Sequence, residues 1–399
     1  MGRRVQFNVE ITVFPPFTKL PIYATIFHKE QVMARIPVGI LGATGMVGQN
    51  YITLLNDHPW FEVRYVAASP RSAGKKYEET VAGRWQLAKT YAPHVGGIMV
   101  EDANDVSRAV AAFKRNECSF VFSALEMGKD ETRALEEAYA AAGIPVISNA
   151  SAHRWTSDVP VLIAEVNPDH ADIIPLQKKA RGWDRGFIAV KPNCSIQSYM
   201  KPLHALAQAG YPAQRIIVTT MQAVSGAGYP GVPSLDMLDN IVPYIGGEEE
   251  KSEKEPLKIF GSIKNGAFKN AELPKISAHC NRVPVTDGHV ASISLEFGSR
   301  KPGSMEEILS IWAAYKGLPQ EADLPMAPKQ PIIYRKEDNR PQPRKDRDAD
   351  KAMAVVIGRL RPCNVFDIRF TALSHNTVRG AAGGGILNAE LLKYKGYLN

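Results

Sequence analysis

The segment PVGIL-GATGMVGQ, residues 37–49, places a short apolar strand directly before a glycine-rich turn. Residues 50–55 continue with the spacing of a helix. Strand, turn and helix in this order favour dinucleotide binding, because glycines let the backbone approach a pyrophosphate and the helix N-terminus faces its charge. The spacing is GxxGxxG rather than GxGxxG, so the flanking pattern, not the glycines alone, favours nucleotide binding over a purely structural turn.

The second predicted strand, residues 61–68, ends without the Asp or Glu that usually binds the ribose 2′-hydroxyl in NAD-specific sites. Ser69, Arg71 and Ser72 follow it instead. Hydroxyl groups and a cation suit a 2′-phosphate, so we predict NADP as the cofactor. The alternative interpretation of these residues is an ordinary solvated basic loop.

Further strands are predicted at residues 119–125 and 144–149, with a helix at residues 130–142 between them. Strands and helices that alternate at this pace predict a parallel, doubly wound sheet. We therefore expect an α/β fold with a Rossmann-like NADP-binding domain over residues 35–190. Arg154 follows a strand's carboxyl end, where ligands bind in such sheets, although a lone loop arginine is usually just solvated.

A second motif, residues 191–196 (KPNCSI), places Cys194 between an apolar strand at residues 186–190 and a helix-like stretch around Tyr199. At a strand-to-helix turn, converging N–H groups and the helix dipole favour the thiolate and are expected to lower the thiol pKa. The same N–H groups can hold an oxyanion. The alternative is a buried, inert cysteine.

The second half of the chain has few helices. Long or alternating strands are predicted at residues 215–224, 278–285 and 289–297. They indicate a second, α+β domain of mostly antiparallel sheet, which we place at residues 191–375. The C-terminal helix, within residues 376–399, is expected to return to the first domain.

Two segments fit neither domain well. Residues 1–34 are basic, contain two consecutive prolines and show no clear period, so we expect a poorly structured extension. A transit peptide is the other reading of this segment. Residues 319–350 are rich in proline and charge, and we expect an insertion-like surface loop there.

Composition excludes several classes of protein. The formal net charge of +7 is spread out, with no dense basic face for a nucleic acid. No apolar run is long enough to span a bilayer. The 4 cysteines are far apart and show no CxxC spacing, so we expect no metal, no disulfide framework and a cytoplasmic, reducing location. A mildly basic protein suits an anionic small-molecule substrate, not a membrane.

A nucleophilic thiolate also needs an acid or base close by. His289 is a candidate because Arg282, which could grip a carboxylate with two parallel hydrogen bonds, lies seven residues before it. An isolated histidine–arginine pair is more often structural than catalytic. Together with Cys194 and the glycine-rich turn, the pair favours a catalytic site.

The order of these motifs resembles the aspartate-semialdehyde dehydrogenase family, in its archaeal and fungal branch. The resemblance runs from about residue 35 to the C-terminus. It is carried by residues 42–48 (GATGMVG), 192–195 (PNCS), 222–228 (QAVSGAG), 248–251 (EEEK), 282–289 (RVPVTDGH) and 375–383 (HNTVRGAAG).

This resemblance implies a role for each matching residue. Cys194 would be the nucleophile and His289 the general acid and base. The substrate would be held by Arg282, Gln222, Glu248, Asn193, Arg154 and Lys251, the last two binding phosphate. Within the run 248–250, Glu248 is chosen because it shares a helix face with Lys251. The NADP site would comprise Gly42, Thr44, Gly45, Met46, Val47, Gly48, Ser69, Arg71, Ser72, Ser123, Ser225, Gly226 and Asn376.

The implied reaction is the NADP-dependent reductive dephosphorylation of 4-phospho-L-aspartate to L-aspartate 4-semialdehyde, through a thioester on Cys194. It serves the pathway to threonine, methionine, lysine and isoleucine, in a homodimer or homotetramer. An N-acetyl-glutamyl-phosphate reductase is the nearest alternative, but there Gly typically precedes the cysteine and Tyr follows it. A glyceraldehyde-3-phosphate dehydrogenase would show a Ser-Cys-Thr-Thr-Asn run, which is absent. A non-catalytic NADP-sensing protein would need neither Cys194 nor His289.

Overall fold

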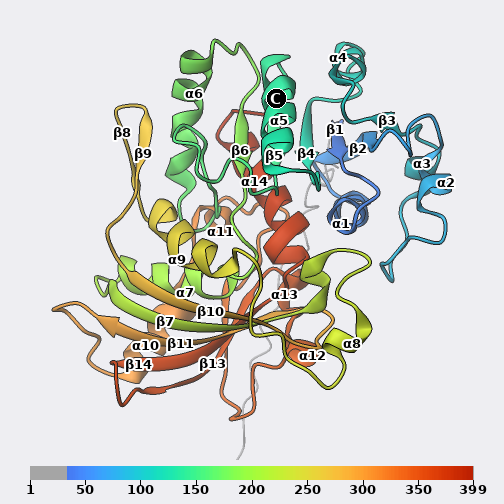
Figure 1. The fold of residues 1–399 in the computed structure, drawn as a ribbon. Helices are drawn as coiled ribbons and strands as arrows, with labels where there is room; N and C mark the ends of the chain where they lie inside the picture. The colour runs from blue at the N-terminus through green and yellow to red at the C-terminus, as the bar shows by residue number, and fades with distance from the viewer. Residues whose placement is uncertain (1–33, 399) are drawn as a thin grey trace, which may run out of the picture. The chain divides into compact units, whose positions relative to one another are not determined.

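The computed structural model describes residues 34–398, so the expected extension at residues 1–34 lies almost wholly outside the described part. Two six-stranded sheets organise the described residues, and Figure 1 shows the first above the second.

The first sheet is parallel throughout, with the strand order β3-β2-β1-β4-β5-β6. Its strands are β1 (Ile36–Leu41), β2 (Phe61–Ala68), β3 (Glu101–Asp102), β4 (Phe120–Ser123), β5 (Val146–Ser148) and β6 (Ile188–Val190). This is the strand order of the doubly wound dinucleotide-binding fold, so the predicted α/β class is confirmed.

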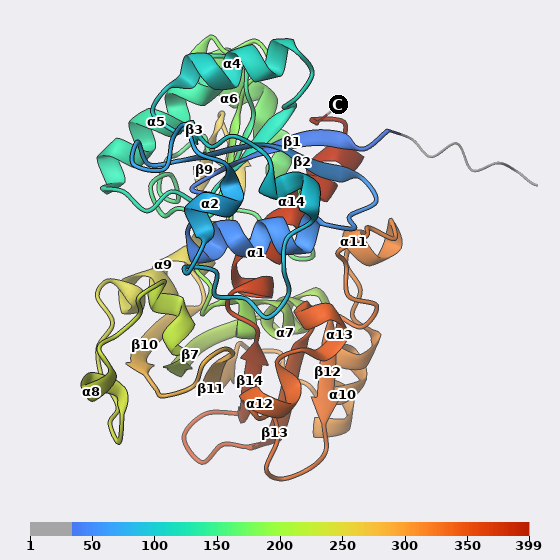
Figure 2. The same cartoon turned by 90° about the vertical axis from the view of Figure 1, so that its right-hand side faces the viewer.

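Helices cover both faces of this sheet. Alternate residues of each strand point to opposite faces, and each face packs against its own set of helices. Val38 of β1 belongs to the core that includes α1 (Met46–Leu55) and α14 (Gly383–Tyr394). Leu41 belongs to the core that includes α4 (Val106–Lys114) and α5 (Lys129–Ala141). Figure 2 shows α14, which follows the last strand of the second sheet, lying close to α1 of the first half.

The second sheet has the order β10-β7-β11-β14-β13-β12. Its strands are β7 (Ala213–Gln222), β10 (Lys275–Arg282), β11 (His289–Phe297), β12 (Ile332–Arg335), β13 (Val355–Pro362) and β14 (Ile368–Ser374). The three inner pairings are antiparallel, whereas the edge strands β10 and β12 each pair in parallel with a neighbour. The sheet is therefore mixed, with the expected antiparallel part at its centre.

One face of the second sheet packs against α7 (Gln197–Gln208) and α10 (Met305–Ala314), which bury Tyr199 and Trp312. Residues of β7 that point the other way stay accessible, and Ile217 is 43% exposed. Among the described residues, no helix thus covers this second face of the sheet.

The other helices are α2 (Tyr77–Val81), α3 (Pro93–Gly96), α6 (Ile174–Arg181), α8 (Ser234–Met237), α9 (Glu248–Ile259), α11 (Leu318–Glu321), α12 (Pro343–Asp346) and α13 (Ala349–Ala352). Short 3-10 helices span Pro168–Ile173 and Val224–Ala227, and a π-helical turn spans Val378–Ala382. A small hairpin joins β8 (Ser262–Lys264) to β9 (Ala267–Lys269).

Residues 319–350 do not form the expected surface loop. They contain the edge strand β12, which pairs with β13, and they bury Leu324 and Ile332. Their charges also pair with one another, since the buried Asp346 accepts hydrogen bonds from Arg335 and Arg340. This charge-rich segment is therefore an ordered part of the second sheet, which its composition did not indicate.

Several predicted boundaries also differ from the structure, among them those of α1 and β10. Helix α1 begins at Met46 rather than near Asn50, because the turn needs no further residue after Gly45. Strand β10 ends at Arg282, three residues before the predicted end. Pro284 has no N–H group with which to continue the ladder, which accounts for the early end.

Candidate active site

The glycine-rich turn leads straight into α1. Gly42 has a φ of +77°, and a Cβ there would lie 2.3 Å from the carbonyl oxygen of Ala124. A Cβ on Gly48 would lie 2.3 Å from the carbonyl oxygen of Gly42, so glycine lets α1 pack on the turn. Gly45 has free space, with the nearest atom 3.5 Å away. The first N–H groups of α1 can therefore meet a bound phosphate.

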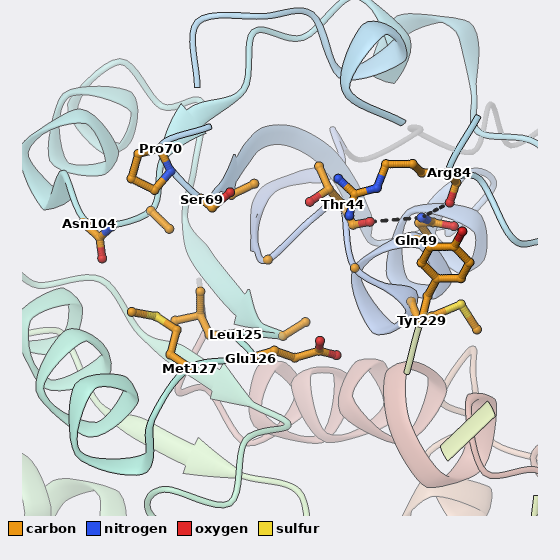
Figure 3. Close-up of a pocket in the computed structure, with 16 residues that line it drawn as sticks. Thr44, Gln49, Ser69, Pro70, Arg84, Asn104, Leu125, Glu126, Met127 and Tyr229 are labelled. Atoms are coloured by element: carbon orange, nitrogen blue, oxygen red, sulfur yellow. Dashed lines mark hydrogen bonds between the residues drawn. The ribbon is translucent and has the colours of Figure 1, made fainter. Parts of the chain in front are cut away.

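A cavity, here called the turn cavity, opens over this turn (Figure 3). Its wall includes five of the residues assigned to the cofactor from the sequence, which are Gly42, Thr44, Gly45, Met46 and Ser69. Sequence reasoning missed several others in the wall, which are Gln49, Arg84, Asn104, Glu126 and Tyr229. Glu126 follows the carboxyl end of β4, and this position was the signal that could have found it.

The cation nearest the turn is not the expected one. Arg71 is exposed and Ser72 is buried, and neither lines the turn cavity. Arg84 does line it, and Figure 3 shows its side chain reaching toward Thr44. Within residues 34–398, Arg84 forms no ion pair. Its backbone carbonyl accepts a hydrogen bond of 3.1 Å from the Gln49 amide, which fixes this loop against α1.

The assignment of Ser123 to the cofactor is not supported by its position. Its side chain is fully buried at the end of β4, and the hydroxyl donates a 2.6 Å hydrogen bond to Glu136. Burial raises the pKa of Glu136 to about 7, while Ser123 and Ser148 oppose the rise through hydrogen bonds. Ser123 thus donates a hydrogen bond to the buried carboxyl group of Glu136 instead of lining the turn cavity.

Cys194 lies between β6 and α7, in the wall of a second cavity, here called the cysteine cavity. The two cavities adjoin, since Met46 and Glu126 line both of them. Further residues of its wall, from both halves of the chain, are Val47, Asn149, Ser151, Arg154, Lys191, Asn193, Ser225, Gly226, Glu248, Lys251 and Asn376. A group held by Cys194 would thus lie next to a ligand bound over the turn.

His289 is the partner of Cys194. The Sγ of Cys194 lies 3.4 Å from Nε2 of His289, and Nδ1 accepts a 3.0 Å hydrogen bond from the backbone N–H of Ala223. A neutral ring that accepts at Nδ1 carries its proton on Nε2. His289 therefore presents an N–H group to the sulfur, and the neutral ring cannot take the proton of the thiol.

The electrostatics of the pair differ from the sequence-based expectation. Burial raises the pKa of Cys194, so the strand-to-helix turn does not by itself lower it as predicted. The reason is that desolvation of the thiol outweighs the nearby positive charges, and α7 begins only at Gln197, three residues later. Burial and the charge of Arg282 lower the pKa of His289 to about 3, so its ring is neutral at physiological pH.

Arg282 and Gln222, at the ends of β10 and β7, lie beside this pair but do not line the cysteine cavity directly. Arg282 is buried, and Nη1 donates a 2.9 Å hydrogen bond to the carbonyl of Ala223. A Cβ on Gly226 would lie 3.0 Å from that Nη1 and 3.2 Å from Cε1 of His289. Gly226 therefore leaves the space in front of both side chains open.

Glu248, at the start of α9, is the member of the run 248–250 that lines the cysteine cavity. Both its oxygens accept from the Asn193 amide, at 3.0 and 2.9 Å, and the Lys251 ammonium lies 2.7 Å away. Gln222 donates to it at 3.4 Å. Glu249 instead accepts from the backbone N–H of Cys280. The structure thus brings together Glu248, Asn193, Gln222 and Lys251.

Arg154 is more constrained than a solvated loop arginine. Its nitrogens donate to Glu255 at 2.9 Å, to the carbonyl of Lys191 at 3.1 Å and to the carbonyl of Asn149 at 3.0 Å. Glu255 also accepts the backbone N–H of Asn193 at 2.6 Å. Two of the five N–H donors of a guanidinium remain for a ligand. Glu255, which the sequence analysis missed, fixes both Arg154 and the cysteine turn.

Asn376 joins the two cavity-lining loops. Its amide donates a 2.8 Å hydrogen bond to the hydroxyl of Ser225, and its carbonyl oxygen accepts the N–H of Gly288 at 2.8 Å. Gly288 directly precedes His289. Asn376 thus fixes the 3-10 helix at Val224–Ala227 relative to the catalytic histidine candidate.

Within residues 34–398, no group of three or more His, Cys, Asp or Glu side chains is placed to hold a metal ion. The same residues contain no helix that is both long and apolar enough to cross a membrane.

Comparison with known proteins points to one family. Residues 37–174 match the model of the semialdehyde dehydrogenase NAD-binding domain, and residues 201–379 match that of the semialdehyde dehydrogenase dimerisation domain. An aspartate-semialdehyde dehydrogenase from Archaeoglobus fulgidus is 46% identical over 90% of this chain and 98% of its own length. The enzyme of the same name from Aspergillus fumigatus is 44% identical over 90% and 98%.

A solved structure shows the same fold. The chain superimposes with a TM-score of 0.82 on the aspartate-semialdehyde dehydrogenase with NADP from Candida albicans, at 39% identity, covering 92% of this chain and 100% of that one.

Proposed function

Since the chain belongs to the aspartate-semialdehyde dehydrogenase family, as the sequence comparisons show, we propose that it reduces 4-phospho-L-aspartate to L-aspartate 4-semialdehyde with NADPH and releases phosphate. The observation that carries this proposal is the Cys194–His289 pair, 3.4 Å apart, in a cavity that adjoins the one over the glycine-rich turn. The proposed nucleophile thus lies next to the proposed dinucleotide site.

The turn cavity fits a dinucleotide. Gly42 and Gly48 let the turn and α1 pack closely, Gly45 leaves open space, and the first N–H groups of α1 can meet a pyrophosphate. Thr44, Met46, Val47 and Ser69 would contact the cofactor, and Arg84 would meet a 2′-phosphate. When bound there, NADPH supplies the hydride that reduces the thioester.

In the proposed first step, the thiolate of Cys194 attacks the acyl carbon of the substrate. The new S–C bond forms, the C–O bond to the phosphoryl group breaks and phosphate leaves. The Nε2–H group of His289 would donate a hydrogen bond to the reacting centre, a role that its contacts with Cys194 and Ala223 support. Arg154 and Lys251, which line the cysteine cavity, would hold the phosphate.

Substrate recognition would use the side chains around Cys194. Arg282 forms no ion pair with any residue in the described range, so its guanidinium is free to hold the substrate carboxylate. Glu248 would meet the ammonium group, with its carboxylate oriented by Asn193, and Gln222 would orient the substrate. These roles follow the family resemblance, and the observed contacts support them.

The alternative functions find less support. In an N-acetyl-glutamyl-phosphate reductase, glycine would replace Asn193, and the two contacts with Glu248 would be lost. A non-catalytic NADP sensor would not need a cysteine within 3.4 Å of a buried histidine. The match to a dimerisation domain indicates an oligomer. We expect a homodimer or homotetramer in the cytoplasm, with the face of the second sheet that exposes Ile217 as the interface.

The test is an assay with L-aspartate 4-semialdehyde, phosphate and NADP, in which NADPH formation is followed by absorbance. We expect a rate that requires phosphate and that is absent with N-acetyl-glutamate 5-semialdehyde. The Cys194→Ala variant should bind NADP normally and be inactive. A phosphate-dependent rate with the second substrate only would identify the reductase instead. Binding of NADP without turnover of either substrate would favour the sensor.

A further inference from the structure

Lys191 stands out among the cations that line the cysteine cavity, which are Arg154, Lys191 and Lys251. Arg154 is paired with Glu255 at 2.9 Å, and Lys251 with Glu248 at 2.7 Å. Within the described residues, the Nζ of Lys191 has one polar contact, the carbonyl oxygen of Pro192 at 2.5 Å, and no carboxylate partner. Its positive charge is therefore not neutralised by the protein.

The side chain of Lys191 is also enclosed. The residue is 3% exposed, and its Cδ packs so close to α14 that a Cβ on Gly384 would lie 3.2 Å from it. Burial lowers the pKa of Lys191 to about 7. An isolated buried ammonium is costly, so a charged Lys191 needs an anion in the cysteine cavity.

The thiolate of Cys194 is a suitable anion. It lies three residues along the chain, in the wall of the same cavity. Burial disfavours the thiolate, and Lys191 is the strongest of the positive charges that oppose this effect, ahead of Arg154 and Arg282. Each ion is unfavourable alone and favoured by the other. His289 cannot supply the charge, because its ring is neutral and its proton already lies on Nε2.

We propose that Lys191 is the cation that stabilises the thiolate of Cys194. The proposal rests on the proposed role of Cys194 as the nucleophile. When Lys191 starts as the amine, the S–H bond of Cys194 breaks, the electron pair stays on sulfur and the proton ends on Nζ. The pair changes from thiol and amine to thiolate and ammonium without a change in net charge.

Other charged groups face this pair from the elements around it. Glu248 of α9 opposes the thiolate, whereas Arg154 and Arg282 favour it. Arg154 and, less strongly, Arg379 oppose the ammonium of Lys191, whereas Glu255 favours it. These groups stay in place when Lys191 is replaced, so a variant at this position isolates the effect of its charge.

The test is the pH dependence of the alkylation of Cys194 by iodoacetamide, followed by peptide mass spectrometry in the full-length protein. Peptide mapping separates Cys194 from the partly exposed Cys363. In Lys191→Met we expect the pH midpoint of Cys194 alkylation to rise, and the alkylation rate at pH 7 to fall about tenfold or more. Lys201→Met removes another buried lysine, which is paired with Glu165 and does not line the cavity, and should leave the midpoint unchanged.

Several outcomes would overturn the proposal. One is an unchanged midpoint in a folded Lys191→Met variant, with NADP binding as the check of folding. Another is a variant in which inorganic phosphate no longer protects Cys194 against alkylation while the midpoint stays the same. Lys191 would then bind phosphate instead of stabilising the thiolate. If the variant does not fold, the wild-type midpoint decides, and a value above about pH 9 contradicts a stabilised thiolate. Alkylation needs no turnover, so failure of the proposed reaction would be seen separately in the assay.

Discussion

The backbone N–H of Ala223 donates a 3.0 Å hydrogen bond to Nδ1 of His289. This contact sets the proton of the neutral ring on Nε2, which faces the sulfur of Cys194 at 3.4 Å. A protonated ring would place two N–H groups against each other at Nδ1. The contact therefore makes His289 a hydrogen-bond donor to the reacting atoms before any substrate arrives.

The first prediction concerns removal of this donor. In His289→Asn, kcat should fall by about 10²- to 10³-fold, as when one preorganised hydrogen-bond donor to the reacting centre is removed. NADP binding should stay unchanged, because His289 does not line the turn cavity. Steady-state kinetics and a cofactor titration measure the two effects. A rate close to that of the wild type would contradict the assigned role.

The second prediction concerns pH. Burial and the charge of Arg282 lower the pKa of His289 to about 3, so the ring loses its proton far below the working range and stays neutral above it. The pH profile of kcat/KM should therefore show no ionisation of His289 between roughly pH 5 and pH 9. His289→Asn should lower the profile without moving its midpoints. An acidic limb that is present in the wild type and lost in the variant would refute this.

The third prediction concerns Asn193, whose amide donates two hydrogen bonds to Glu248. In Asn193→Ala, the carboxylate loses this support, and kcat/KM for the semialdehyde should fall about tenfold or more, as for other hydrogen bonds to charged groups. The KM for NADP should not change. Glu250→Ala, on the same helix but outside the cysteine cavity, is the matched control and should stay active. Equal loss in both variants would point to a folding effect.

Much of this site could be predicted because it is encoded locally. The glycine-rich turn and the segment around Cys194 each combine a strand, a turn and a helix within a short stretch of sequence. Long-range contacts could not be read in this way. Glu255 reaches Asn193 across 62 positions, and Arg84 enters the turn cavity from a loop without regular structure. The charge-rich segment at residues 319–350 hid β12, because its charges pair only in the folded chain.

The fourth prediction follows from the position of Arg84. It lines the turn cavity, whereas Arg71 does not. In Arg84→Ala, kcat/KM with NADP should fall about 10- to 100-fold, the value of a charge-assisted contact to phosphate, and kcat/KM with NAD should change little. Arg71→Ala is the matched control and should keep the preference for NADP. If the two variants behave the other way round, Arg71 binds the 2′-phosphate and the sequence-based assignment was correct.

The last prediction concerns a buried ion pair that links the two halves of the chain. Glu165 accepts two 2.7 Å hydrogen bonds from Arg379, and the ammonium of Lys201 lies 3.4 Å away. Burial alone would raise the pKa of Glu165, but the charges of Arg379 and Lys201 outweigh it and lower the pKa to about 2. A lowered pKa means that the charged form stabilises the fold.

This stabilisation is complete above the ordinary pKa of 4.5 and is lost as the pH falls from there toward 2. Glu165→Gln should therefore lower the free energy of unfolding by about 3 to 5 kcal/mol at pH 7, because two buried cations lose their partner. The difference from the wild type should shrink as the pH falls below 4.5. Urea unfolding at fixed protein concentration measures it. Glu296→Gln, which breaks the solvent-screened pair with Arg215, should change the free energy of unfolding far less, and an equal loss in both variants would contradict this prediction.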